Sequence, residues 1–364
     1  MKKLLAIVLA MAMLLSLAAC GASSTPATEA PVTAAPATEA PAAETPVAAE
    51  SEFILTVEPS CEKGDKIEKI AYIPMSTTND YFLAMCNEFV AQFTAAGFYA
   101  EYTSPDFDPV RQQEILENYV TQGFDCIVVF PINAASLSSA VAAAREQGVI
   151  VICQVNQTDE CDGWIGTDAY GLGEGAAKLA TEWVEKNYAG AADGTIKAAI
   201  MEIRTDDNNS TIADGCAAIT DLCSKIEVVT TVGVTEETEA AAQAAAENLF
   251  VTNPDVQVII CSTTALATGV DAYLTSMSSP VSDLSQIAIF TCGSDHAVYD
   301  CVAASTDNSS VIRGISSYAP MSVGAAFLTN IVLNLSNGIT EGNFVADPQY
   351  LLNPDNIGVY LSAG

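Results

Sequence analysis

Polar and aromatic side chains gather at the predicted carboxyl ends of successive strands. They supply ring faces, hydroxyl and amide donors, and carboxylate acceptors, the mixture that a binding cleft for a neutral polar molecule requires. Each of them alone is more commonly a helix cap or a packed ring, so the prediction depends on the whole set. The set is Asn79, Tyr81, Phe82, Asp168, Arg204, Thr263, Thr264, Asp295 and Tyr318.

The stretch from Lys69 to Phe82 shows how such a strand end is built. Residues 70–73 are a short apolar run of strand length, bounded by Pro74. Residues 76–80 are turn and cap formers, and an apolar stripe with helical spacing begins at Phe82. In a parallel α/β sheet, ligands bind at the carboxyl ends of the strands. This first loop is therefore a candidate binding edge.

Strand and helix patterns alternate through the rest of the chain. The strand predicted over 125–130 is apolar throughout, as in a parallel sheet that is covered on both faces. After a helix that ends near Asn187, the alternation restarts with a strand over 195–203. This alternation predicts an α/β fold with two doubly wound parallel sheets.

Composition excludes several classes of function. The chain has 364 residues, a formal net charge of −32 and one histidine, so a nucleic-acid partner is excluded because phosphate binding needs a basic face. Gly171–Ala176 fits a dinucleotide fingerprint, but three residues separate it from the preceding strand, which favours close helix packing instead. The chain has no C-x-x-C metal spacing, and no catalytic triad can be assembled around His296. We therefore expect no enzyme activity, no cofactor and no metal.

The N-terminus has the pattern of a secretory signal followed by a tether. Lys2 and Lys3 precede an apolar run and a Leu-Ala-Ala-Cys ending, which resembles a bacterial lipobox. That resemblance implies a signal peptide over 1–19, cleavage before Cys20 and lipidation of the Cys20 thiol. Residues 20–65 are dominated at first by Ala, Pro, Thr and Glu, so we expect a disordered tether there.

The eleven cysteines do not form an obvious disulfide framework. Most lie within predicted strands and helices, where a free thiol behaves as a small apolar side chain. We expect mostly free thiols, with Cys153 and Cys161 as the leading candidates for a disulfide.

The body from about Lys66 onward resembles the type I periplasmic-binding-protein family, the ribose/galactose-type solute-binding lipoproteins of ABC importers. Several pieces match that family in order along the chain. They are the lipobox, the loop ending in Asn79-Asp80-Tyr81-Phe82, Gln122–Pro131, Gly166-Thr167-Asp168, Asn253–Val256, Gly293-Ser294-Asp295, Pro320–Gly324 and Asn353–Ile357.

The resemblance implies two lobes that are joined by three crossovers and close on a ligand. It implies an N-terminal lobe of residues 66–167 with 319–342, and a C-terminal lobe of residues 168–318 with 343–364. Asn79, Tyr81 and Phe82 would contact ligand from the first lobe, Asp168 would lie at the first crossover, and Asp295 would accept from ligand hydroxyls. The partners implied are a small-molecule ligand, ABC permease and ATPase subunits, and the cell membrane through the lipid anchor. We expect an extracytoplasmic monomer.

Departures from the family pattern leave the ligand open. The usual sugar-binding arginine is replaced by Ile212, and Arg204 is the candidate substitute cation. The family's Asn-Asp pair is replaced by Thr263-Thr264, its hinge glutamine by Tyr318, and the acid after the fourth strand by Val155 or Asn156. We expect a small uncharged polar ligand, with a sugar as the leading candidate and a nucleoside or furanose-like signal as the alternative. A receptor subunit for a signalling kinase, and an enzyme on the same scaffold, are the competing functions.

Overall fold

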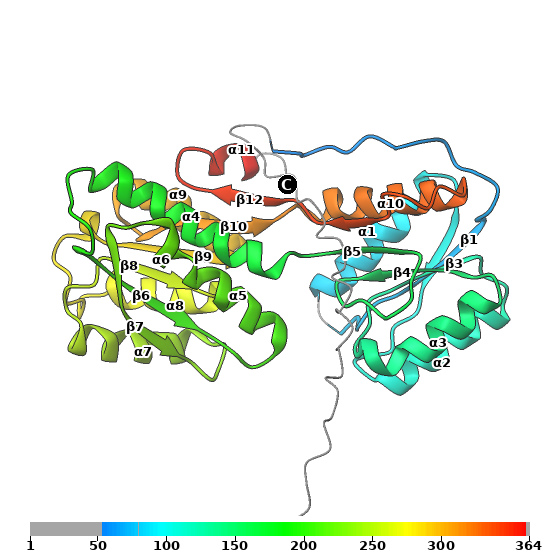
Figure 1. Cartoon of the computed structure of the whole chain (residues 1–364), viewed down its shortest axis with the longest axis horizontal. Coiled ribbons are helices and arrows are strands. Elements are labelled where there is room, and N and C mark those ends of the chain that lie inside the picture. Colours follow the sequence, from blue (N-terminus) through cyan, green and yellow to red (C-terminus); the bar gives the residue numbers. More distant parts are fainter. Residues whose placement is uncertain (1–52, 79, 362–364) are drawn as a thin grey trace, which may run out of the picture. The chain divides into compact units, whose positions relative to one another are not determined.

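The computed structural model describes residues 53–78 and 80–361, and its first lobe contains a six-stranded sheet in the order β11-β5-β4-β3-β1-β2 (Figure 1). Every neighbouring pair is parallel. The strands are β1 (Lys69–Ile73), β2 (Tyr99–Tyr102), β3 (Cys126–Val129), β4 (Ile150–Gln154), β5 (Gly163–Gly166) and β11 (Phe344–Ala346). Helices α1 (Asp80–Ala95) and α10 (Met321–Ser336) cover one face, and α2 (Pro109–Thr121) and α3 (Ala134–Glu146) cover the other.

The second lobe contains another six-stranded sheet, in the order β12-β10-β9-β8-β6-β7. Its strands are β6 (Ile196–Glu202), β7 (Ile226–Gly233), β8 (Val258–Cys261), β9 (Ala288–Gly293), β10 (Ile312–Tyr318) and β12 (Gln349–Leu352). Helices α4 (Ala169–Asn187), α5 (Asp207–Ala217) and α6 (Ile219–Leu222) pack on one face. Helices α7 (Glu239–Thr252), α8 (Thr264–Leu274), α9 (His296–Ala304) and α11 (Ile357–Leu361) pack on the other. The predicted fold of two doubly wound lobes is confirmed.

One strand departs from the predicted parallel order. Strand β12 runs antiparallel to β10, with Ser317 opposite Tyr350. Strand β11 ends at the carboxyl edge of the first sheet, and only Asp347 and Pro348 separate it from β12. The chain therefore enters the second sheet at the edge where β10 ends, so β12 must run in the opposite direction.

The chain passes between the lobes three times. The first crossover follows β5 at Thr167-Asp168, the second follows β10 at Ala319-Pro320, and the third is Asp347-Pro348. Backbone hydrogen bonds connect the third crossover to the other two. Asp347 N donates to Gly166 O, next to the first crossover, at 2.7 Å, and Ala319 N of the second crossover donates to Pro348 O at 3.0 Å. The boundary expected between 342 and 343 is wrong because β11 pairs with β5 in the first sheet.

Residues 53–64, here called the strap, make contacts with both lobes although they were assigned to the tether. On α10, the side-chain amides of Asn330 and Asn337 donate to the carbonyl oxygens of Glu58 and Glu62, at 3.0 and 2.8 Å. At the other end, the Phe53 ring lies 5.2 Å from the Tyr350 ring. Side-chain amides satisfy backbone groups of a segment that forms no helix or strand, so the tether boundary expected at 65 is too late.

Two further predictions concern the N-terminal segment and the cysteines. Cys20, the signal peptide and tether residues 20–52 lie outside them. Every cysteine within them is a free thiol, including Cys153 and Cys161, so the expected disulfide candidate is not bonded. No helix in the described ranges is long and apolar enough to cross a bilayer.

Candidate functional site

Four aromatic rings form a wall at the carboxyl edge of the first sheet. Phe82 is their hub, with its ring centroid 5.7 Å from Tyr81, 5.9 Å from Phe107 and 6.2 Å from Phe130. All three contacts are edge-to-face, the arrangement that aromatic pairs prefer. The rings come from the segments that follow β1, β2 and β3, so three separate strand ends converge here. We call these four residues the aromatic wall.

A strained turn brings Phe107 into the wall. Asp106 and Phe107 have φ values of 54° and 64°, in the left-handed region that non-glycine residues rarely adopt. The turn is held because Phe107 N donates to Met75 O at 2.8 Å and Ser104 Oγ donates to Asp106 Oδ1 at 2.6 Å. Such strain persists only where the surroundings fix it, and it is common at ligand sites.

A second strained residue positions Asn156 after β4. Val155 has φ 58°, an outlier for a β-branched side chain. It is fixed on both sides, because its N donates to Ile165 O at 2.7 Å and its O accepts from Trp164 Nε1 at 2.9 Å. Asn156 Nδ2 then donates to Pro131 O at 2.8 Å, which ties this loop to the one that follows β3. Asn156 thus joins the edge that carries the aromatic wall.

Tyr81 of the wall, Tyr318 and Asp347 lie within electrostatic range of one another. The Tyr81 side chain is 60% exposed, yet burial raises the pKa of its hydroxyl and the Asp347 carboxylate raises it further. Burial also raises the pKa of Tyr318, with smaller contributions from Tyr81 and Asp347. We call these three residues the hinge cluster.

Asp347 is the member of this cluster that sequence reasoning missed. Its Oδ1 is buried and has no hydrogen-bond partner among the described residues. Burial raises the pKa of its carboxyl group to about 7. The sequence feature that could have identified it is the Asp347-Pro348 pair between two short strands, β11 and β12. The expected lobe boundary places this pair inside the second lobe, so it does not stand out as a crossover.

The two predicted aspartates of the second lobe are engaged as helix caps, whereas the two predicted threonines are not. Asp168 Oδ1 caps α4 by accepting from Gly171 N at 2.8 Å, and Asp295 Oδ1 caps α9 by accepting from Ala297 N at 2.9 Å. Thr264 opens α8 and is half-buried. Next to it, the buried Oγ1 of Thr263 has no partner among the described residues.

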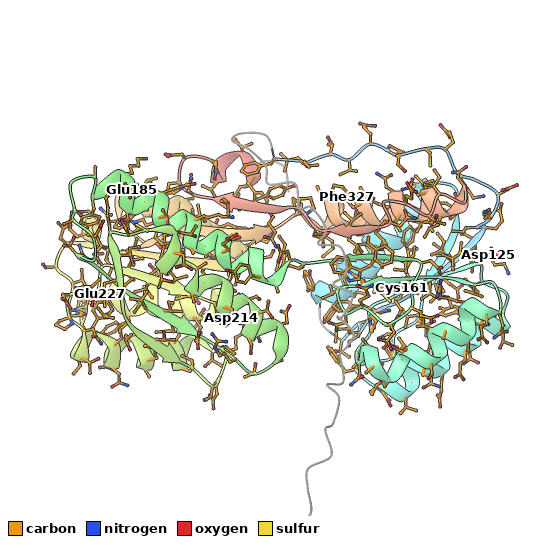
Figure 2. The ribbon with its side chains drawn as sticks, viewed as in Figure 1. Asp125, Cys161, Glu185, Asp214, Glu227 and Phe327 are labelled. Atoms are coloured by element: carbon orange, nitrogen blue, oxygen red, sulfur yellow. The ribbon has the colours of Figure 1, made fainter. Side chains whose placement is uncertain are left out.

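Arg204 does not offer a free cation. Its Nε lies 2.6 Å from Glu202 Oε1, and its Nη1 lies 2.8 Å from Asp214 Oδ1. Asp214 is a residue of α5 and is labelled in Figure 2. A guanidinium held between two carboxylates has its charge neutralised within the lobe. The structure therefore brings Tyr81, Phe82 and Asn156 to one edge, and leaves Arg204 in an ion-pair network. Asn79 lies outside the described residues.

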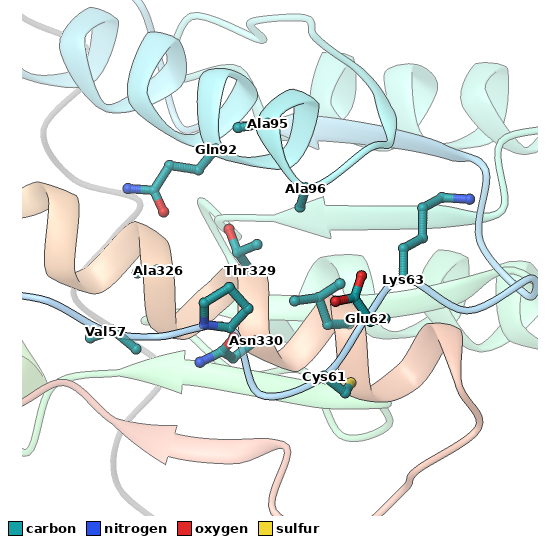
Figure 3. Close-up of a pocket in the computed structure, with 12 residues that line it drawn as sticks. Val57, Cys61, Glu62, Lys63, Gln92, Ala95, Ala96, Ala326, Thr329 and Asn330 are labelled. Carbon is teal, nitrogen blue, oxygen red and sulfur yellow. The ribbon is translucent and has the colours of Figure 1, made fainter.

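A cavity of about 440 Å³ lies away from this edge, beneath the strap (Figure 3). It is lined by the strap and by α1 and α10, with Gln92, Ala96 and Asn330 among its residues. Gln92 is eleven residues beyond Tyr81, about 16 Å along the helix. The lining has no aromatic ring and no cluster of unpaired polar groups, so the strand-end edge is the better candidate site.

Comparison with known proteins agrees with this geometry. Residues 70–333 match the family described as "Periplasmic binding protein domain". Among solved structures, the chain is similar to the periplasmic ribose ABC transporter from Conexibacter woesei, with a TM-score of 0.69 and 18% identity over 82% of this chain and 96% of that one. It is also similar to the arabinose-binding protein AraP from Geobacillus stearothermophilus, with a TM-score of 0.64 and 16% identity over 81% and 99%.

A third structure was solved with a ligand. It is a periplasmic solute-binding protein of an ABC transporter from Actinobacillus succinogenes with bound D-allose, with a TM-score of 0.64 and 15% identity over 80% of this chain and 100% of that one. At these identities the structures share the fold. With its two α/β lobes, three crossovers and a family match over most of its body, the chain belongs to the periplasmic binding protein family.

Proposed function

We propose that this protein is an extracytoplasmic solute-binding lipoprotein of an ABC importer. It captures a small uncharged polar ligand, most simply a sugar, when its two lobes close on it. Contacts that form only when both lobes meet the ligand favour the closed arrangement. Transport is then the work of permease and ATPase subunits, and the receptor itself carries out no reaction.

The aromatic wall is the observation that carries this proposal. Phe82 and its three neighbouring rings present an apolar surface at the edge where ligands of parallel α/β sheets bind. The hinge cluster beside it adds two hydroxyl groups and a carboxyl group. Rings with a few convergent polar groups are the usual lining of sites for small polar ligands.

The lack of a free cation supports an uncharged ligand. Arg204, the one arginine among the predicted site residues, is paired with Glu202 and Asp214. The chain as a whole carries a net charge of −32. Binding of a carboxylate or phosphate group would need a cation that the described site does not present.

A thermal-shift screen tests the ligand class. A ligand that binds only the folded state raises the unfolding temperature in proportion to the logarithm of its concentration above Kd. D-Ribose, L-arabinose, D-allose, myo-inositol and a set of nucleosides form the panel, with amino acids and peptides as controls. We expect a rise with one of the sugars, whereas a rise with amino acids or peptides alone would contradict the proposal. A rise with nucleosides alone would instead support the nucleoside alternative, which the four-ring wall also accommodates.

A partition experiment tests the anchor. If Cys20 is lipidated, the full chain expressed in a bacterium partitions into detergent, and a Cys20→Ala variant remains in the aqueous phase. Cys61→Ala is the matched control, because Cys61 is a free thiol of the strap. Equal partition of the wild type and Cys20→Ala would contradict the lipoprotein assignment.

A further inference from the structure

One oxygen of the Asp347 carboxylate is buried without a partner in the part of the chain that the structure describes, while the residue as a whole is half-buried. Its Oδ1 is removed from solvent and accepts no hydrogen bond. Burial of an unpaired carboxylate is unfavourable, so such a group in a native structure needs an explanation. Asp347 lies in the third crossover, where its backbone N donates to Gly166 O at 2.7 Å and so holds the residue next to the first crossover.

Among the described residues, the neighbours of Asp347 provide no cation and no hydrogen bond to its buried carboxylate oxygen. The titratable groups on which its carboxylate acts are the hydroxyls of Tyr81 on α1, Tyr318 at the end of β10 and Tyr350 on β12. The Tyr350 hydroxyl donates to Ile54 O, but those of Tyr81 and Tyr318 have no partner among the described residues. On α10, a Cβ added at Gly324 would lie 3.4 Å from Asp347 Oδ1, so α10 offers no side chain there.

We propose that Asp347 is a ligand-contacting residue, and that its carboxylate accepts a hydrogen bond from a hydroxyl group of the ligand. The hydroxyls of Tyr81 and Tyr318, within electrostatic range of Asp347, would be further partners for the same ligand. This inference rests on the proposed function and sharpens it. The ligand must carry a hydroxyl donor, as polyols do, and a molecule with acceptors alone would leave the carboxylate unsatisfied.

Proton release is the consequence that can be measured. Burial raises the pKa of the Asp347 carboxyl to about 7, so the free protein holds this group partly protonated at neutral pH. A hydrogen bond from a ligand hydroxyl favours the ionised form and lowers the pKa. Binding therefore releases protons, and affinity rises with pH as the proton that competes with the ligand is removed.

Calorimetry of the wild type in buffers of different ionisation enthalpy measures this release directly. The probes are D-ribose, L-arabinose, D-allose and myo-inositol. At pH 7 we expect roughly half a proton released per bound ligand, and affinity that rises up to about tenfold per pH unit below pH 6. The Asp347→Asn variant should release no proton and bind about tenfold more weakly at pH 8, because it lacks the charged acceptor. Asp355→Asn is the matched control, since Asp355 pairs with Lys186 in an exposed position.

The outcomes separate this inference from the proposed function. Sugar binding with no proton exchange between pH 6 and 8, and with unchanged affinity in a folded Asp347→Asn variant, would overturn the role of Asp347 and leave the receptor function intact. Failure of the wild type to bind any of the four probes would overturn both. Proton release that is lost in Asp347→Asn and retained in Asp355→Asn supports the assignment.

Discussion

The carboxyl edges of the two sheets are built from similar residue types and differ in how those residues are used. On the first lobe, the aromatic wall meets solvent-accessible space, and the hydroxyl of Tyr81 has no partner among the described residues. On the second lobe, Asp168 and Asp295 cap helices and Arg204 is held by two carboxylates. Charged groups that are already paired gain little from a ligand, and Thr263 is the one predicted second-lobe residue with a buried, unpaired hydroxyl among the described residues. Recognition should therefore depend mainly on the first lobe and the hinge cluster.

Replacement of Phe82 should have the largest effect on binding. Phe82→Ala removes the ring on which the other three converge, so we expect sugar affinity to fall roughly 30-fold or more. Titration calorimetry of the folded variant measures the loss. Phe124→Ala is the matched control, because Phe124 packs on Tyr119 within the same lobe at 4.7 Å and should affect stability alone. Unchanged affinity in a folded Phe82→Ala variant would show that Phe82 belongs to the hydrophobic core and not to the binding site.

The pH dependence of stability should reveal Asp347 in the absence of ligand. Burial gives its carboxyl group a folded-state pKa of about 7, above the unfolded value, so its contribution to stability is complete at low pH and is lost as pH rises through 7. Between pH 5 and 8 the unfolding temperature of the wild type should fall roughly 2–6 °C more than that of Asp347→Asn. Parallel curves for the two proteins would mean that Asp347 titrates at an ordinary pKa.

Removal of the Asn156 side chain should have an intermediate effect. Asn156→Ala deletes the bond to Pro131 O and an amide oxygen that has no partner in the described residues. We expect binding to weaken about 3- to 10-fold, the value of one or two neutral hydrogen bonds. Asn187→Ala is a suitable control, since within the described ranges its side chain bonds to Trp183 O of its own helix and to no other group. Equal affinities of the two variants would exclude Asn156 from the site.

Replacement of Arg204 should have the smallest effect. Arg204→Gln breaks two ion pairs in which the guanidinium is still 42% exposed, and such pairs contribute little. We therefore expect sugar affinity to change less than about twofold. A tenfold or greater loss of sugar affinity would show that Arg204 leaves Glu202 and Asp214 to bind the ligand. The second lobe would then contribute as much to ligand recognition as the first.

Local patterns in the sequence predicted the fold and part of the first-lobe edge. The apolar run 70–73, followed by cap formers and then Phe82, identifies a strand end because both signals lie within a few residues. Phe107 was not predicted because its place in the wall depends on two left-handed residues and a backbone bond to Met75, which no local pattern encodes. Arg204 was expected to replace a missing cation, but its partner Asp214 lies ten residues away on α5.

The third crossover shows the same limit. Strand β11 has three residues, too few for a periodic pattern, and its membership of the first sheet depends on pairing with β5. Without that pairing Asp347 could not be recognised as a hinge residue. The strap was missed for a related reason, since its contacts come from asparagine side chains about 270 positions further along the chain.

The most direct test of the account is a calorimetric titration with the sugar that gives the largest thermal shift, run on the wild type, Phe82→Ala and Arg204→Gln. We predict saturable one-to-one binding to the wild type, a loss of roughly 30-fold or more in Phe82→Ala and retained affinity in Arg204→Gln. Absence of saturable binding by any neutral polyol, or a larger loss in Arg204→Gln than in Phe82→Ala, would contradict it.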